Sequence, residues 1–362
     1  MKLAFRSVVD ACREVGIVTV ACLSKEQLES ILRVEKERLI AWQNAGYAGE
    51  MQYMQRSPEL FCNPENLLTN FKSAVVCYVP YPTLSYQPTP YGHGRIARYA
   101  MFADYHVVIK DALHQAIDTV LRTVHPLKFK YRIFSDAVPF LEKSTAYHSG
   151  LGFIGKNLLL SVPGIGSFGF IAEILLDVEL DIDSNTKLDV TVSQHKVENT
   201  CGACSRCLKS CPTHALIDDG RQLNATMCIS YLTIEKKTLL TEKEMRMIGD
   251  NLFGCDRCQD VCPNNKAALS VAGTILHDKQ ILPQFLALKD ILALNNDDDF
   301  DRVFHGTSLT RAGRDRLVRN ACCVVANNPH AEFTPILTQL AQHDQSELVR
   351  SQATMALEVI QM

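Results

Sequence analysis

Residues 201–212 read Cys201-Gly-Ala-Cys204-Ser-Arg-Cys207-Leu-Lys-Ser-Cys211-Pro212. Two gaps of two residues, then a gap of three and a proline, are the spacing with which bacterial ferredoxins hold cubane iron–sulfur clusters. In that arrangement the first three thiolates bind one cluster and the fourth cysteine reaches a second. The run therefore predicts a ferredoxin-like module that carries two [4Fe–4S] clusters.

A second run, Cys255-Asp-Arg-Cys258-Gln-Asp-Val-Cys262-Pro263, repeats the end of the first but lacks its first cysteine. Two cubanes need eight ligands, and Cys228 is the natural eighth. Crossing the ligands assigns one cluster to Cys201, Cys204, Cys207 and Cys262, and the other to Cys211, Cys228, Cys255 and Cys258. The alternative is a pair of structural zinc sites, but four-ligand zinc does not explain a third close cysteine with a trailing Cys-Pro.

Composition limits where the chain works and what it binds. Eight of its 14 cysteines lie between residues 201 and 262, which in a reducing compartment favours metal ligation over disulfides. No apolar run approaches the length needed to span a membrane, and acidic and basic residues follow the N-terminus too soon for a signal peptide. We therefore expect a cytoplasmic protein without a membrane partner. A net charge of −3 means that any RNA must be bound by a local basic patch.

Length predicts two or three domains. Residues 1–185 alternate helical patterns, at about 25–45 and 105–124, with strand-like runs at 73–79, 131–134 and 169–176. This order predicts a mixed α/β domain that is not doubly wound. A polar stretch at about 181–200 leads into a ferredoxin-like domain at 186–275.

Residues 276–362 are predicted to be entirely α-helical. Residues 317–326 and 348–357 share a pattern at a spacing of 31 residues, which HEAT-like helical repeats would explain and two unrelated amphipathic helices would explain equally. Five arginines between residues 302 and 319 form a candidate RNA patch, with a solvated helix face as the alternative.

A glycine run at residues 150–157 matches the dinucleotide pattern Gly-x-Gly-x-x-Gly. Its context argues against a nucleotide site, because it follows a helical segment and leads into a strand-like one. We predict instead a glycine-rich turn that packs closely against a bulky cofactor.

Several segments, covering nearly the whole chain, together resemble the epoxyqueuosine reductases, a family of cobalamin- and iron–sulfur-dependent enzymes. They are Gly94-Arg-Ile-Ala-Arg-Tyr-Ala100 with Asp104-Tyr-His106, Ser135-Asp-Ala-Val-Pro-Phe-Leu-Glu-Lys143 with the glycine run, Gly166-Ser-Phe168, Cys228-Ile-Ser-Tyr-Leu-Thr-Ile-Glu235, Phe253-Gly-Cys-Asp-Arg-Cys-Gln-Asp-Val-Cys-Pro263 and Arg311-Ala-Gly-Arg-Asp-Arg-Leu-Val-Arg-Asn-Ala321.

The resemblance implies a cobalamin-holding α/β domain, a two-cluster module and a C-terminal helical repeat domain. It implies removal of the epoxide oxygen of epoxyqueuosine at the tRNA wobble position, as water, with two electrons passed from the clusters to cobalt and two protons. By resemblance the proton donor is Asp136, whose pKa burial against the corrin would raise. The alternative is that Asp136 caps a helix near residues 140–146.

The resemblance also maps corrin contacts onto Ala97, Asp136, Leu160, Ser230 and Asp256. The chain departs from relatives at Phe61, where they often have arginine. Asp104-Tyr-His106 begins the motif of a cobalt-ligating histidine, but Ile109 fills its glycine position, so His106 is not predicted to bind cobalt.

The expected partners are the anticodon stem-loop of tRNA and an unidentified electron donor. We expect the chain itself to be a monomer. Candidate phosphate contacts are Lys236, Lys237, Arg314 and Arg319. Two rival functions remain at this stage: another corrinoid reductase of the reductive dehalogenase kind, and a ferredoxin module that transfers electrons without a substrate of its own.

Overall fold

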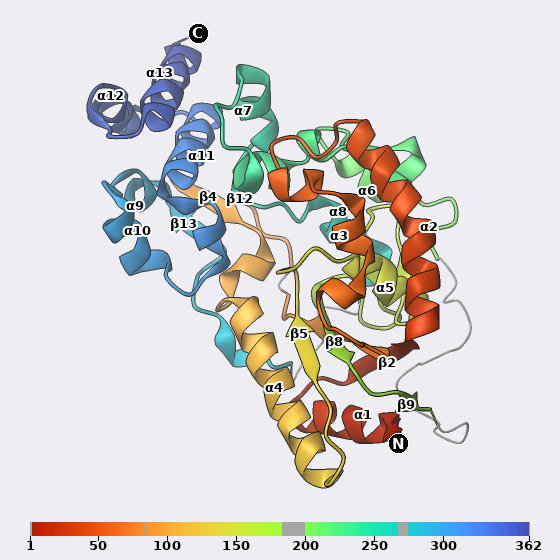
Figure 1. Cartoon of the computed structure of the whole chain (residues 1–362). Coiled ribbons are helices and arrows are strands. Elements are labelled where there is room, and N and C mark those ends of the chain that lie inside the picture. Colours follow the sequence, from red (N-terminus) through yellow and green to blue (C-terminus); the bar gives the residue numbers. More distant parts are fainter. Residues whose placement is uncertain (1, 84, 183–199, 267–273, 362) are drawn as a thin grey trace.

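A four-stranded antiparallel sheet lies at the centre of the N-terminal half (Figure 1). The computed structural model describes residues 2–83, 85–182, 200–266 and 274–361. The strands, in spatial order, are β2 (Thr19–Ser24), β3 (Ser73–Pro80), β8 (Gly169–Leu176) and β5 (Tyr131–Phe134). The three predicted strands are confirmed, and the antiparallel order confirms that this sheet is not doubly wound.

Helices cover both faces of this sheet because its strands are apolar on both sides. One face packs against α1 (Phe5–Glu14) and α4 (Tyr105–Thr123). The other packs against α2 (Lys25–Asn44) and α5 (Glu142–His148), and α3 (Pro58–Cys62) lies beside α2. Both predicted helices are confirmed, and a capping box at Ser24 begins α2.

The end of this half is marked by a short parallel pair, β1 (Leu3–Ala4) with β9 (Leu180–Asp181). The predicted polar connection and the domain boundary at 185/186 fall on residues 183–199, outside the described residues.

The cysteine-rich part is built from short elements. They are α6 (Arg206–Ser210), β10 (Leu216–Ile217), β11 (Gln222–Leu223), a π-helical turn (Tyr231–Glu235), α7 (Glu242–Ile248), β12 (Asn251–Phe253) and α8 (Arg257–Asp260). Helices α6 and α8 pack together, which brings the two cysteine runs side by side.

A second sheet draws one strand from each of the three predicted domains. Its order is β12, then β4 (His93–Ile96), then β13 (Phe285–Ala287), with β12 parallel and β13 antiparallel to β4. The prediction that residues 276–362 are entirely α-helical is therefore wrong at β13. A three-residue strand is too short to show a periodicity, and β13 forms because β4 offers it a partner.

The remaining C-terminal elements are α9 (Leu288–Leu292), α10 (Asp297–Phe304), α11 (Gly313–Asn327), α12 (Thr334–His343) and α13 (Glu347–Gln361). The two similar segments lie in α11 and α13, which pack on each other beside the C-terminus (Figure 1). The HEAT-like assignment stays a prediction. Within the described ranges, no helix is both long and apolar enough to cross a lipid bilayer.

Candidate functional site

A cavity of about 870 Å³ is enclosed by segments that are far apart in the sequence. Its walls come from the α2–α3 region, the start of α4, the loop between β5 and α5, the turn after Cys228, and residues 308–311. Its volume is in the range of cofactor sites, and much of its lining is aromatic or aliphatic.

Asp136 lies on the wall of this cavity, in a left-handed backbone conformation with φ 51°. Its Oδ2 accepts a hydrogen bond from the Tyr105 hydroxyl at 3.0 Å, and its amide N donates to Glu142 Oε1 at 2.6 Å. Helix α5 begins at Glu142 with Leu141 as its N-cap, without a side-chain cap. The alternative that Asp136 caps this helix is therefore wrong.

Aromatic rings form the wall beside Asp136. Tyr105 stacks on Phe170 with ring centroids 3.9 Å apart and on His106 at 4.0 Å. Burial, and then the nearby charge of Asp136, raises the pKa of Tyr105 well above its ordinary value, so its hydroxyl remains a donor at neutral pH. His106 pairs with Asp104, Nδ1 to Oδ1 at 2.7 Å.

The facing wall contains residues that the sequence did not single out. The π-helical turn places Tyr231, Ile234 and Glu235 on the cavity, and such turns are frequent at functional sites. Arg311 Nε donates to Glu235 Oε1 at 3.0 Å, and its guanidinium lies 5.1 Å from the Tyr53 ring centroid. In the sequence, Arg311 was one of five clustered arginines and the first residue of a segment that resembles the family, without a role of its own.

Of the predicted corrin contacts, Asp136 and Ser230 line the cavity and the other three do not. Leu160 is buried in the short hairpin β6 (Phe153–Ile154) and β7 (Leu160–Ser161). Ala97 is buried against Gly254, where an added Cβ would lie 2.7 Å from that of Ala97. Asp256 accepts a hydrogen bond from the Arg98 amide at 2.8 Å. The structure thus assigns these three side chains to the protein interior.

Phe61 is buried at 4% exposure and lines the cavity, so it gives the wall an apolar surface at this position.

One of the two predicted cysteine groups lines a small separate cavity. The cysteines on it are Cys201, Cys204, Cys207 and Cys262, the set predicted from crossed ligands. The glycine run adjoins them, since Lys156 N donates to Cys201 Sγ at 3.5 Å and an added Cβ on Gly155 would lie 3.7 Å from that sulfur. The buried Nδ2 of Asn157, on the same cavity, has no hydrogen-bond partner in the described part of the chain.

The second group surrounds Cys228. Burial raises the pKa of the Cys228 thiol, and the charge of Cys211 raises it further. Burial also raises the pKa of Cys255 to about 12, and the charge of the neighbouring Cys228 contributes in the same direction. Burial raises the pKa of Cys258, and the charge of Cys255 raises it further. Cys228 also lines the large cavity, so this group is the nearer of the two to it.

Within residues 2–83, 85–182, 200–266 and 274–361, no three His, Cys, Asp or Glu side chains converge on one point closely enough to hold one metal ion. A cubane places an iron at each cysteine, so its sulfurs are held further apart.

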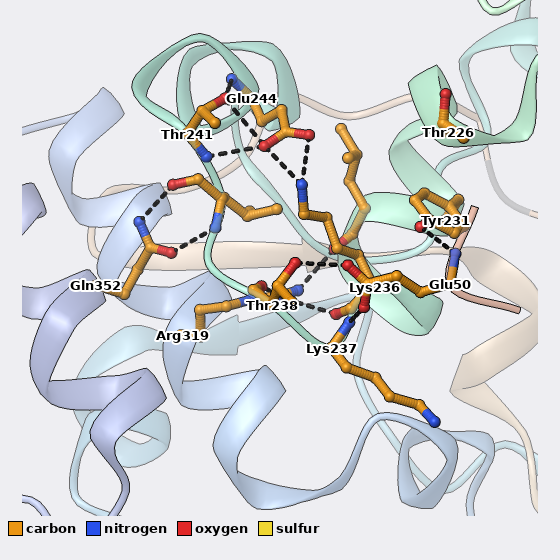
Figure 2. Close-up of polar contacts among 12 residues, drawn as sticks. Glu50, Thr226, Tyr231, Lys236, Lys237, Thr238, Thr241, Glu244, Arg319 and Gln352 are labelled. Carbon is orange, nitrogen blue, oxygen red and sulfur yellow. Dashed lines mark hydrogen bonds and ion pairs between the residues drawn. The ribbon is translucent and has the colours of Figure 1, made fainter.

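Two of the predicted RNA contacts are buried. Arg314 is 1% exposed, with Nη1 2.7 Å from Asp344 Oδ1 and Nη2 2.7 Å from the Leu294 carbonyl. Arg319 is fully buried, and its guanidinium donates to the carbonyl oxygens of Leu232, Lys236 and Thr238 (Figure 2). The prediction that these arginines contact phosphate is therefore wrong, because their donors are already bound inside the protein.

The two lysines differ from each other. Lys236 Nζ forms an ion pair with Glu244 Oε1 at 2.7 Å. Lys237 is exposed, and Figure 2 shows its side chain pointing away from the surrounding network. Of the four predicted phosphate contacts, Lys237 alone is both exposed and directed outward.

Two family models match this chain. Residues 62–137 match the model described as "Epoxyqueuosine reductase QueG, DUF1730", and residues 200–265 match the 4Fe-4S double cluster binding domain. An epoxyqueuosine reductase of Pseudomonas aeruginosa is 34% identical over 359 residues, covering 97% of this chain and 93% of the relative. Another, from Aliivibrio fischeri, is 33% identical over 298 residues, covering 80% and 75%.

Solved structures give the same result. A crystal structure of epoxyqueuosine reductase with an epoxyqueuosine-modified tRNA-Tyr stem loop matches with TM-score 0.82 and 27% identity, over 98% of this chain and 90% of the other. The Bacillus subtilis epoxyqueuosine reductase with its catalytic aspartate loop swung out of the active site matches with TM-score 0.81 and 27% identity, over the same shares.

Proposed function

The chain belongs to the epoxyqueuosine reductase family, and we propose that it performs this reduction on cobalamin held in the large cavity. It is an oxidoreductase that converts epoxyqueuosine in tRNA to queuosine, and it contains a 4Fe-4S double cluster binding domain. The observation that carries the proposal is one cavity bordered both by a carboxyl group, Asp136, and by a predicted cluster ligand, Cys228.

The lining of the cavity combines aromatic and aliphatic side chains, which would pack on a corrin ring, with polar groups, which would bind its amide side chains. Ser230 and Asp136 provide polar atoms, and the buried Ser308 Oγ on the same wall lacks a hydrogen-bond partner in the described residues. Cobalamin bound there would supply the two-electron chemistry that breaks the epoxide C–O bonds. Cys211, Cys228, Cys255 and Cys258 would hold the nearer cluster, and Cys201, Cys204, Cys207 and Cys262 the more distant one.

Asp136 acts as the acid in this proposal. Without a proton donor the C–O bond would break to an alkoxide, and a positioned acid accelerates such a step by roughly 10² to 10⁴. The Tyr105 hydroxyl, 3.0 Å from Oδ2, orients the carboxyl group toward the cavity. Loss of the oxygen as water consumes two protons, of which Asp136 holds one.

The substrate in this proposal is the anticodon stem-loop, bound in the cytoplasm by a single copy of the chain that draws electrons from a separate donor. The modified base has to leave its stack to reach an internal cavity, as for other enzymes that act on a base. Exposed Lys237 provides a phosphate contact beside the turn that lines the cavity.

The test is anaerobic turnover of epoxyqueuosine-containing tRNA by the cluster-reconstituted protein with a strong reductant, with and without cobalamin, scored by nucleoside mass. We expect loss of one oxygen only when cobalamin is present. Trp42, the chain's one tryptophan, lines the cavity, so its fluorescence should fall as cobalamin binds. Retention of the oxygen by a cobalamin-loaded, cluster-replete sample would contradict the proposal and favour another corrinoid substrate.

A further inference from the structure

An ion pair at the edge of the large cavity has no role in the reaction proposed above. Arg311 and Glu235 both line this cavity. Two parallel hydrogen bonds join them, from Arg311 Nε to Glu235 Oε1 at 3.0 Å and from Nη2 to Oε2 at 3.3 Å. The Arg311 side chain is 55% exposed and that of Glu235 is 18% exposed. The pair therefore lies where a molecule that enters the cavity from solvent would meet it.

Neighbouring side chains fix the position of this pair. Arg316 donates from Nη2 to the Arg311 carbonyl at 2.6 Å and from Nη1 to the Ile234 carbonyl at 2.8 Å. One side chain thus joins the two backbone segments that carry the pair. The ring of Tyr53 supports the Arg311 guanidinium from the α2–α3 region. Such support fixes the direction in which the polar atoms of the pair point, which recognition of a ligand requires.

The ion pair keeps polar atoms available for a ligand. A guanidinium has five N–H donors and a carboxylate about four acceptor sites, and the two hydrogen bonds within the pair use two of each. Arg311 and Glu235 can therefore present an N–H donor beside a carboxylate acceptor, without net charge. A flat, uncharged molecule that has an acceptor next to a donor would match this arrangement.

The Watson–Crick edge of guanine has this pattern, with the O6 acceptor next to the N1–H and amino donors. Epoxyqueuosine is a derivative of 7-deazaguanosine and has the same edge. Arginine donates to guanine O6 and carboxylates accept from base amino groups in many complexes with nucleic acids. Adenine has a donor in place of O6 and an acceptor in place of N1–H, so it would oppose both members of the pair. Enzymes that act on a flipped base commonly read this edge and stack the base on aromatic rings, and Tyr53 and Tyr231 line the same cavity.

We propose that Arg311 and Glu235 form the subsite that recognises the flipped wobble base, an inference that rests on the proposed function. Arg311 donates to O6 of the base, and Glu235 accepts from its N1–H and amino groups. Selection of a guanine-type base thus belongs to this pair, and proton donation remains with Asp136.

The first measurement is the affinity of the cluster-reconstituted protein for two anticodon stem-loops that differ only in having guanosine or adenosine at the wobble position. We expect the wild type to bind the guanosine stem-loop at least about fivefold more tightly. Glu235→Gln and Arg311→Lys should bind the two stem-loops almost equally. Glutamine brings an amino group toward the donors of the base, and lysine keeps the charge but lacks the planar guanidinium.

The control is a similar pair on α7, where Arg246 donates from Nε and Nη2 to Glu242 Oε1 on an exposed surface. Glu242→Gln and Arg246→Lys should keep the preference for guanosine. Equal binding of the two stem-loops by the wild type would overturn the proposal. A preference that survives in both Glu235→Gln and Arg311→Lys would overturn it as well.

The second measurement is single-turnover reduction of epoxyqueuosine-containing tRNA over a range of tRNA concentrations. We expect both variants of the pair to raise the half-saturating tRNA concentration and to keep the limiting rate. A lower limiting rate at an unchanged half-saturating concentration would contradict a role in base recognition. A wild type that prefers guanosine but leaves epoxyqueuosine unreduced would remove the proposed function alone, whereas one that reduces it without any preference would remove only this subsite.

Discussion

Asp136 is placed differently from Glu142 and Glu173. It is exposed to the cavity and bonded to the Tyr105 hydroxyl, whereas Glu173 is fully enclosed. A group that exchanges protons with a substrate needs this accessibility, because the donor and the reacting atom must come within hydrogen-bond distance.

Changing Asp136→Asn should slow epoxyqueuosine reduction by roughly 10² to 10⁴, because the amide keeps the shape of the side chain but has no acidic proton. Single-turnover assays with measured tRNA and cobalamin affinities would show a loss in rate with both affinities unchanged. Asp111→Asn, on an exposed position of α4, is the matched control. An Asp136→Asn enzyme as fast as this control would rule out the donor role.

Lys237 can be tested in the same way for the RNA. Changing Lys237→Glu should weaken tRNA binding and reduce the slope of log affinity against log salt by about 1, because one phosphate contact is lost. Filter binding over a range of salt concentrations measures both quantities. Lys110→Glu, an exposed lysine of α4, provides the control, and equal behaviour of the two variants would exclude the contact.

At the scale of elements, α11 joins the helical end to the rest of the protein. Asn320 donates to the carbonyl oxygens of Thr233 and Leu252, and Arg319 to three carbonyl oxygens around the turn after Leu232. The basic residues of this helix thus hold the cavity wall and the C-terminal helices in place.

The change Arg314→Ala should reduce the free energy of unfolding by about 3 to 5 kcal/mol, because Asp344 would be left buried without its partner. Denaturant titration of the cofactor-free protein measures this effect. Arg302→Ala removes an exposed arginine paired with Asp299 and should leave the free energy of unfolding almost unchanged, because water screens this pair. Similar losses in the free energy of unfolding for both variants would contradict the predicted cost of leaving Asp344 buried and unpaired.

The cysteine module makes a separate prediction. Cys228→Ala should remove about half of the bound iron, because it takes a ligand from one cluster and leaves the other set intact. Cys62→Ala, a thiol outside the module, should keep the full iron content. Iron and sulfide analysis after anaerobic reconstitution distinguishes the two, and full iron content in Cys228→Ala would require another eighth ligand.

Over the whole molecule, the site is assembled from all three predicted domains. The sheet β12-β4-β13 takes a strand from each of them. Trp42 Nε1 donates to the Leu223 carbonyl at 2.7 Å, and Glu50 accepts from the Lys237 amide at 2.6 Å, so the α2 region and the cysteine module are joined at two places.

Buried acids should make global stability depend on pH. The native chain binds protons at Glu142 and Glu173 more tightly than the unfolded chain does, so stability should fall as pH rises from about 4.5 toward the raised pKa, about 8 for Glu142. Thermal unfolding of the cofactor-free protein should show a wild-type midpoint that falls more steeply over this range than that of a double variant, Glu142→Gln with Glu173→Gln.

Between about pH 4.5 and 8, the free energy of unfolding of the wild type should fall by at least about 1 kcal/mol more than that of the double variant. Asp256, whose pKa burial raises to about 6, acts in the same direction but is present in both and cancels. Parallel curves for the wild type and the double variant would show that these two acids ionise normally.

The sequence alone determined features that depend on neighbours along the chain. Cysteine spacing predicted the double-cluster domain, because seven of the eight ligands fall into two short runs whose internal spacing is typical of ferredoxins. Periodicity located α2, α4 and the long strands of the first sheet, since each is long enough to repeat its pattern.

Only the tertiary structure decided which polar residues are available. From the sequence, the arginines of α11 were predicted to form either a phosphate-binding patch or a solvated helix face. In the structure, Arg314 and Arg319 are buried. Glu173, within the run Ile-Ala-Glu-Ile-Leu-Leu, was an acid in an apolar strand that could have been noticed, but its neighbours Val76 and Phe134 come from other strands. Burial and charge at a site are set by chain segments that packing brings together, and local sequence does not contain that information.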